Sequence, residues 1–144
     1  MPHRTLRQIV GQQKLLHVSP ETNVLDAARQ MADRHVAAML VTEQGKLAGI
    51  FTERDLLRRV VIAGLAPEGT RIGDVMSPHP IAIGADQSGT EALRVMAEAG
   101  VRHLIVEGCG EDGFAILSMR DFMSGEVAEA EREINFQRKL WEDL

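Results

Sequence analysis

The 144-residue sequence predicts an α+β fold in which one structural unit occurs twice. The first observation is a repeat, because residues 25–41 match residues 90–106 at an offset of 65. Identical residues in the two copies are Ala27 and Ala92, Arg29 and Arg94, Met31 and Met96, Ala32 and Ala97, Val36 and Val101, and Val41 and Val106. The second observation is the order of patterns, since in each copy a helical apolar period precedes two short apolar runs separated by a glycine-containing turn. We therefore predict two β-α-β-β-α repeats.

The elements of each repeat follow from its apolar runs. In the first repeat we expect strands over residues 15–18, 36–41 and 47–51, and helices over 24–34 and from Glu53. In the second repeat we expect strands over 81–83, 101–106 and 114–117, and helices over 90–99 and from Met119. The predicted buried stripes of the two long helices are Leu25, Ala28 and Ala32 in the first and Leu93, Met96 and Gly100 in the second.

Neither repeat has enough apolar sequence for a core of its own. We therefore expect the two repeats to pack sheet to sheet as one intramolecular pair, followed by a C-terminal helix. The predicted organisation is an N-terminal segment and first repeat over 1–66, a linker and second repeat over 67–127, and a helical tail over 128–144. A glycine-rich stretch near residues 64–73 is typical of the connection between the repeats.

A hydroxyl residue followed three positions later by an aspartate recurs where the last strand of each repeat meets its last helix. The pairs are Thr52 with Asp55 and Ser118 with Asp121. One interpretation is helix capping, which contributes about 1 kcal/mol. The other is a ligand site, because a helix N-terminus favours a phosphate and a carboxylate can accept hydrogen bonds from a ribose diol. The spacing alone leaves both interpretations open.

Residues beside these two strand-to-helix junctions, here called corners, bear on the ligand interpretation. Arg54 and Arg120 follow the hydroxyl residues and could pair with phosphates, or lie solvated in the first helical turn. Gly49 would let a ligand approach the backbone closely. Ala115 stands at the corresponding position of the second repeat, where its methyl group would narrow that approach.

Taken together, these segments resemble the CBS domain family over roughly residues 7–127. The strongest points of resemblance are GIFTERDLL at 49–57, VRHLIV at 101–106 and DVMSPHPIAI at 74–83. The duplicated arrangement is similar to a CBS pair, or Bateman module. This resemblance implies a regulatory module with two related clefts that binds an adenosyl ligand: AMP, ADP, ATP, S-adenosylmethionine or a dinucleotide such as NAD(H). No further cofactor is implied.

The resemblance also implies roles for particular residues. Asp55 and Asp121 would hold the ribose. The phosphates would contact Thr52, Ser118, Arg102 and His103. The backbone of Leu16 and Ile81 would bind the edge of the adenine, and Ser77 is a further candidate for a ligand contact. The chain departs from the family pattern at Ala115, which replaces glycine, at Ile105, which replaces proline, and at Ala37-Ala38, which stand where the second repeat has Arg102-His103. The two clefts are therefore expected to differ, and one of them could be empty.

Composition restricts the function classes. A net charge of −5 and few aromatic residues disfavour a nucleic-acid surface. No apolar run approaches the ~18 residues of a membrane span, and the start of the chain lacks the apolar region of a signal peptide, which favours a cytoplasmic protein. The single cysteine, Cys109, allows neither an intrachain disulfide nor a multi-cysteine zinc site. Since no histidine pair has metal-ligand spacing and no nucleophile–base motif occurs, we expect neither a metal site nor catalysis.

Residues 126–144 have the pattern of a charged helix. Ala130, Ile134 and Trp141 share one stripe, and Phe136, Leu140 and Leu144 form a second. This helix could dock on its own module, or it could form a dimer or partner contact anchored by the only tryptophan. The family resemblance implies a homodimer.

The predicted function is a stand-alone regulatory module that binds an adenosyl ligand between its repeats and signals to an unidentified protein partner by a conformational change. The alternative is a non-enzymatic, dimeric interaction module whose clefts do not bind. A small enzyme is a third hypothesis, against which the lack of a nucleophile–base motif counts.

Overall fold

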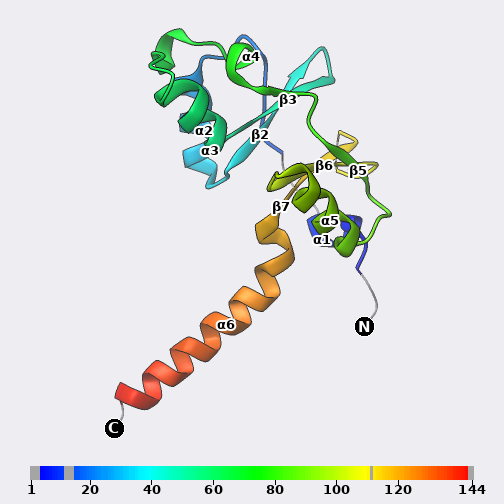
Figure 1. Cartoon of the computed structure of the whole chain (residues 1–144), viewed down its shortest axis with the longest axis vertical. Coiled ribbons are helices and arrows are strands. Elements are labelled where there is room, and N and C mark those ends of the chain that lie inside the picture. Colours follow the sequence, from blue (N-terminus) through cyan, green and yellow to red (C-terminus); the bar gives the residue numbers. More distant parts are fainter. Residues whose placement is uncertain (1–3, 12–14, 111, 143–144) are drawn as a thin grey trace.

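A computed structural model describes residues 4–11, 15–110 and 112–142, which form two α+β units and a long C-terminal helix (Figure 1). The strands are β1 (His17–Val18), β2 (Ala38–Glu43), β3 (Lys46–Thr52), β4 (Ser77–Pro78), β5 (Ala82–Gly84), β6 (His103–Glu107) and β7 (Phe114–Ser118). The helices are α1 (Leu6–Val10), α2 (Val24–Arg34), α3 (Glu53–Asp55), the π-helical η1 (Leu56–Val61), the 3-10 helix η2 (Pro67–Gly69), α4 (Ile72–Val75), α5 (Gly89–Ala99) and α6 (Met119–Glu142).

The two units repeat one sheet topology. In the first unit β1 lies parallel to β2, which lies antiparallel to β3, and in the second unit β5, β6 and β7 are arranged in the same way. The long helix of each unit begins at a side-chain cap, where Asn23 accepts the N–H of Asp26 and Ser88 accepts the N–H of Glu91. The predicted α+β fold with two β-α-β-β-α repeats is therefore confirmed.

Both faces of each middle strand are buried, which explains their unbroken apolar runs. On β2, Met39 and Val41 belong to the core under the helices of the first unit. Leu40, between them, belongs instead to a cluster that includes Ile50 of β3 and Ile105 of β6. Because successive side chains of a strand point to opposite faces, this cluster lies where the two sheets meet. The predicted packing of sheet against sheet is confirmed.

The prediction of which helix face is buried was wrong by one residue in the sequence. The residues of α2 that are buried are Val24, Ala27 and Met31, whereas Ala32 is exposed. In α5, Met96 is buried as predicted, but Leu93 is 38% exposed. The buried and the predicted stripes have the same helical period, so the sequence period defines the helix but not which of two adjacent apolar faces the sheet covers.

Helix α1 was not predicted, and it packs against the second unit although it precedes the first in sequence. Leu6 and Val10 join the core of the second unit, and the N–H of Leu6 donates to the carbonyl of Gln87. Thr5 and Gln8 form a capping box at the start of this helix. This Thr-x-x-Gln spacing before an apolar pair is a sequence signal for a helix start.

The segment between the repeats folds back on the first unit. Ile72 and Val75 of α4 are buried in the core of the first unit. After α4, Ser77 and Pro78 form β4, which pairs antiparallel with β3. The first sheet therefore has a fourth strand that the second sheet, among the described residues, does not have.

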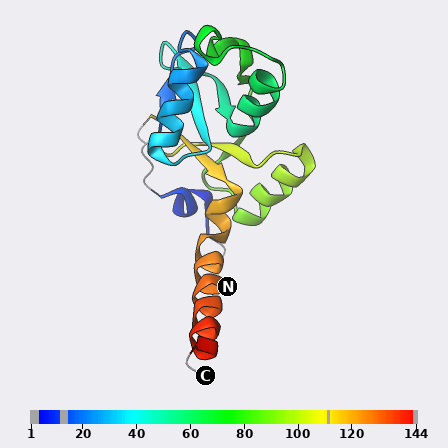
Figure 2. The same ribbon diagram turned by 90° about the vertical axis from the view of Figure 1, so that its left-hand side faces the viewer.

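The predicted last helix of the second repeat and the predicted tail form one helix, α6, which projects away from the two units (Figures 1 and 2). Ile134, Phe136, Leu140 and Trp141 are between 52% and 75% exposed. Leu144 lies outside the described residues. Docking of the tail on its own module is therefore contradicted for the described part of α6 that carries these side chains.

Candidate functional site

The first strand-to-helix corner is a closed capping box. Thr52 donates its backbone N–H to Asp55 Oδ2 at 3.0 Å, and Thr52 Oγ1 accepts the N–H of Asp55 at 3.2 Å. Thr52 Oγ1 also lies 3.2 Å from Asp55 Oδ2, to which its hydroxyl can donate. Asp55 is only 7% exposed. The capping interpretation of this motif is therefore correct for the first repeat.

The other oxygen of this carboxylate is bound by the linker and by helix η1. Ser77 Oγ donates to Asp55 Oδ1 at 3.0 Å, and Arg59 Nε lies 3.6 Å from the same oxygen. Arg59 also donates from Nη1 to the carbonyl of Met76 at 2.8 Å. Ser77, predicted as a ligand residue of the second repeat, is thus placed beside the aspartate of the first. Sequence reasoning missed Arg59, although its i,i+4 spacing from Asp55 was a signal.

Gly49 has a structural role that differs from the one expected. A Cβ atom at this position would lie 2.7 Å from Met76 Sδ and 2.7 Å from the Ser77 carbonyl oxygen. The close neighbour that requires glycine is therefore the linker strand β4, not a ligand. In the second unit no β4 lies beside β7 among the described residues, and Ala115 is fully buried there.

The second corner repeats the backbone contact but not the surroundings. Ser118 donates its N–H to Asp121 Oδ2 at 2.8 Å. Ser118 pairs across the sheet with His103, whereas Thr52 pairs with Ala38 in the first unit. Ser118 and His103 lie on the same face of the second sheet as Ile116 and Ile105, which belong to the cluster between the sheets. The second corner therefore has an imidazole beside its hydroxyl on the inter-sheet face.

His103 lies within electrostatic reach of both corners. Burial lowers the pKa of its imidazole, and the nearby carboxylates of Asp121, Glu53 and Asp55 oppose this effect. Arg102 acts in the same direction as burial. Two of the three carboxylates come from the first repeat and one from the second. The charges of both corners therefore act on a single inter-repeat region.

The first backbone N–H of each corner helix already has a partner. Glu53 donates its N–H to the carbonyl of Ala37, and Met119 donates to the carbonyl of Arg102, both at 3.0 Å. The expectation that free helix N-termini would bind a phosphate is weakened, because these donors are occupied. Side chains are better placed for an anion, and Arg54, Arg102 and Arg120 are all exposed.

The backbone groups expected to read an adenine edge are used within the sheets. The carbonyl of Leu16 accepts the N–H of Leu40, and the carbonyl of Ile81 accepts the N–H of Ile105. Since backbone groups of successive strand residues point to opposite sides, His17 and Ala82 are the residues that direct theirs to the open edges of β1 and β5. The backbone groups that are free for a ligand at these strand edges therefore lie one residue from Leu16 and Ile81, and the adenine contact itself stays a prediction.

His17 also links the two units. Its Nε2 atom lies 3.1 Å from Asp112 Oδ2 in the hairpin between β6 and β7. The two atoms are within ion-pair distance when the imidazole is protonated, but His17 Nε2 has no hydrogen-bond partner among the described residues. The equivalent residue of the second repeat, at the offset of 65, is Ala82. At the open edge of β1 the side chain is therefore an imidazole, whereas at the open edge of β5 it is a methyl group.

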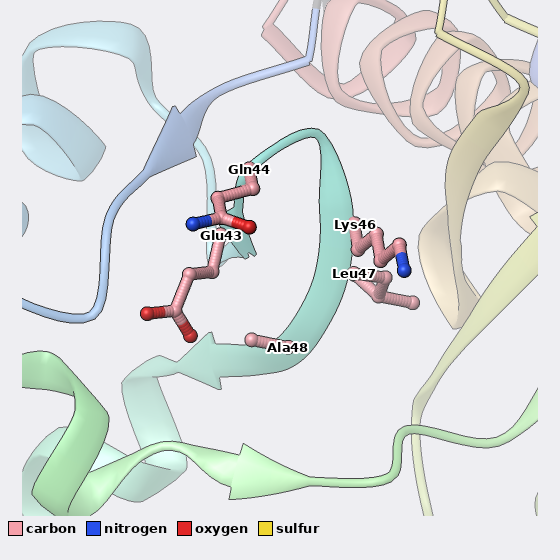
Figure 3. A pocket seen from close by; sticks show the side chains of 5 residues that line it. All are labelled: Glu43, Gln44, Lys46, Leu47 and Ala48. Carbon is pink, nitrogen blue, oxygen red and sulfur yellow. The ribbon is translucent and has the colours of Figure 1, made fainter.

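A shallow hollow of about 360 Å³ lies on the first unit, at the hairpin between β2 and β3 (Figure 3). Its lining residues are Glu43, Gln44, Lys46, Leu47 and Ala48. Strand β3 begins at this hollow and ends at Thr52, so the hollow and the corner lie at opposite ends of the strand. The hollow is therefore a feature of the hairpin and not of the predicted ligand site.

Other chemistry finds little support in the described residues. Among them, no group of three or more histidine, cysteine, aspartate or glutamate side chains could hold a metal ion. A helix that could span a membrane is not found among the described residues. Burial raises the pKa of the Cys109 thiol, although Arg7 opposes this effect, and a raised pKa disfavours the reactive thiolate.

The fold and the two corners define a tandem α+β module whose repeats meet sheet to sheet. The family model described as the CBS domain matches residues 7–62 and 72–126, so the chain belongs to the CBS domain family. It is 41% identical over 99 residues to the CBS domain-containing protein CBSCBSPB2 of Arabidopsis thaliana. That match covers 68% of this chain but only 18% of the relative, so the chain spans about a fifth of the relative's length.

Solved structures show the same fold. A signal-transduction protein with CBS domains from Burkholderia ambifaria, described as putative in function, is 28% identical with a TM-score of 0.78, covering 87% of this chain and 95% of that one. The CBS domain protein PAE2072 from Pyrobaculum aerophilum, complexed with AMP, is 19% identical with a TM-score of 0.69. That match covers 82% of this chain and 89% of the other, and at this identity it shows the fold alone.

Proposed function

We propose that this CBS pair is a regulatory module that binds an adenosyl ligand between its two repeats. The observation that carries the proposal is that Ser118 of the second corner lies opposite His103 on the face where the two sheets meet. Carboxylates of both corners raise the pKa of this imidazole, which agrees with that position. A carboxylate beside basic side chains is the combination that a ribose and its phosphate need. The AMP complex of a protein with the same fold supports the choice of ligand class.

In the proposed binding mode, Asp55 and Asp121 accept the ribose hydroxyls, while Thr52, Ser118, Arg102 and His103 contact phosphate. Arg54 and Arg120 are exposed beside the corners and add positive charge. The adenine edge is read by the backbone of β1 or β5 at His17 or Ala82, one residue from the positions first expected. AMP, ADP, ATP, S-adenosylmethionine and NAD(H) all carry the adenosine that these groups would recognise.

The bond between Ser77 and Asp55 offers a route from binding to signalling. In this route, a ribose hydroxyl takes the place of the Ser77 hydroxyl on Asp55 Oδ1, where Ser77 donates its hydrogen bond in the structure. The replacement would loosen β4 and the linker from the first sheet. A ligand shifts such an equilibrium only by its difference in affinity between the two arrangements, and this competition supplies that difference. The loosened linker would then change the surface that a regulated protein partner in the cytoplasm contacts.

The proposal is tested with ligand-free protein in a thermal-shift and calorimetry panel of ATP, ADP, AMP, S-adenosylmethionine and NADH. A ligand at ~100 times its Kd stabilises the fold by about 2.7 kcal/mol. Asp55→Asn and Asp121→Asn should each weaken binding at one cleft. The matched control is Asp33→Asn, because Asp33 is an exposed aspartate of α2 that has no part in the proposed binding mode. No response to any of the five ligands would contradict the proposal.

A non-binding interaction module is the second candidate. The observation in its favour is that both oxygens of Asp55 already have partners within the protein. In addition, Ala37 and Ala38 replace the basic pair in the first repeat. The same panel separates the two functions, because a protein that self-associates but responds to no ligand fits only this candidate.

A further inference from the structure

Helix α6 carries large apolar side chains that are exposed in the structure. Ile134 is 56%, Leu140 52% and Trp141 75% exposed. The helix projects from the body in two perpendicular views (Figures 1 and 2). A helix in water gains most of its stability by packing an apolar face, so a 24-residue helix with such a stripe is expected to have a partner.

The spacing of the stripe is that of a coiled coil. Apolar residues occur at 127, 130, 134 and 141. Together with Gln137 these positions are spaced alternately three and four residues apart, as in a heptad repeat. In this heptad, Val127, Ile134 and Trp141 occupy a positions, while Ala130 and Gln137 occupy d positions. Phe136 falls outside the seam, at a c position, although it is 58% exposed.

We propose that α6 pairs in antiparallel orientation with α6 of a second copy of this chain. In the antiparallel register, position 134 meets position 137 of the second copy, and position 130 meets position 141. The largest side chain of the seam, that of a tryptophan, therefore meets the smallest, that of an alanine, which is the size match that a close helix pair requires. Two-fold symmetry makes each of these contacts twice.

Charge also favours the antiparallel orientation. It brings position 131, a glutamate, beside position 138 of the second copy, an arginine. A parallel pair would also bring one opposite-charge pair together, at positions 133 and 138, but it would offset this gain by placing the glutamates at 126 and 131 beside each other. Opposite charges at flanking positions select orientation in coiled coils, and like charges oppose it.

The charge of the segment disfavours a lipid surface as the partner. Residues 126–144 contain six acidic residues (Glu126, Glu129, Glu131, Glu133, Glu142 and Asp143) and three basic ones (Arg132, Arg138 and Lys139). Helices that lie on anionic membranes carry an excess of lysine and arginine on their polar face. The acidic character is therefore better suited to a self-complementary protein contact, which does not depend on nucleotide binding.

The first test uses Trp141, the only tryptophan of the chain, as a reporter in the full-length protein. Ile134→Glu should weaken self-association in sedimentation velocity at least tenfold, shift the tryptophan emission to the red and increase its quenching by acrylamide. Phe136→Glu is the matched control and should behave as wild type, because it lies outside the seam. If Trp141 is equally quenched in wild type and Ile134→Glu, or if Phe136→Glu is as disruptive, the proposal is overturned. Association through the CBS repeats alone would give the first of these results.

The second test fixes the orientation. Arg138→Glu should weaken association, and adding Glu131→Arg should restore it. Adding Glu133→Arg instead gives a variant of equal net charge that should not recover. In a parallel pair, position 133 is the one that meets position 138, so recovery with Glu133→Arg and not with Glu131→Arg would overturn the antiparallel pairing.

Discussion

The two strand-to-helix corners contain the same hydroxyl–aspartate pair in different surroundings. Asp55 is almost fully buried and is held by Thr52, Ser77 and Arg59. Asp121 is half-buried, and the hydroxyl beside it pairs across the sheet with a histidine. The Ser77 contact arises from β4, which among the described residues joins the first sheet and not the second, whereas the histidine is a sequence difference, since Ala38 stands at its place in the first repeat. A duplicated motif therefore does not imply a duplicated role, and each copy has to be tested separately.

The largest difference is expected on removing the two aspartates. Asp55→Ala leaves the Ser77 hydroxyl, the Thr52 N–H and Arg59 without their shared acceptor, which should cost about 3 kcal/mol of unfolding free energy. Asp121→Ala removes a capping contact and should cost about 1 kcal/mol. Urea or thermal denaturation of the two variants measures the difference. Equal losses would show that the two corners have equivalent environments.

The next largest difference concerns the residues that precede the corners. Gly49→Ala introduces a methyl group 2.7 Å from the Ser77 carbonyl oxygen, so β4 has to move, at a cost of about 2 kcal/mol. The reverse change in the second unit, Ala115→Gly, should cost about 1 kcal/mol through chain entropy and a lost buried methyl group. Chemical denaturation provides both values. A Gly49→Ala variant as stable as wild type would mean that β4 does not pack closely on β3.

The sequence was sufficient for features that depend on local pattern. The repeat at an offset of 65 and the two apolar periods predicted the strand order, the long helices and the sheet-to-sheet pair. Features that depend on distant packing were missed. Whether the sheet covers Ala27 or Ala28 of α2 depends on how the helix crosses the strands, which no local pattern specifies.

The candidate site shows the same limit. The corners themselves follow from the spacing of Thr52 with Asp55 and of Ser118 with Asp121. The position of Ser77 does not, because it depends on the linker folding back beside β3. Which residues of an edge strand keep their backbone groups unpaired also depends on the pairing register. For this reason Leu16 and Ile81 each lie one residue from the free backbone groups.

Removing the hydroxyl that joins the linker to the first corner should have a smaller effect than removing the aspartate. Ser77→Ala deletes one hydrogen bond to a buried carboxylate and should cost about 1.5 kcal/mol. If a ribose competes with Ser77 for Asp55, the same variant should bind the adenosyl ligand more tightly at the first cleft. Isothermal calorimetry measures that affinity, with Ser19→Ala as the control, since Ser19 is exposed and distant in sequence from the corner. Weaker binding by Ser77→Ala would instead assign the hydroxyl a direct role in holding the ligand.

The smallest expected effect is a change in pH dependence at the second corner. Because burial lowers the pKa of His103, the unfolded chain binds the proton more readily than the folded protein. The neutral imidazole therefore makes its full contribution to the unfolding free energy above the ordinary histidine pKa of about 6.5. This contribution is lost as the pH falls below that value. The carboxylates of Asp121, Glu53 and Asp55 reduce this loss, and Arg102 increases it.

His103→Gln should therefore flatten the decline in unfolding free energy between about pH 7 and pH 5, where an ordinary histidine titrates. Denaturation at a series of pH values in constant salt measures the slope. His79→Asn is the control, because His79 is exposed and has a φ of 53°, a conformation that asparagine tolerates. If the slope of His103→Gln matches that of wild type, the imidazole gains its proton as easily in the folded protein as in the unfolded chain. That result would contradict a net lowering of the His103 pKa in the folded protein.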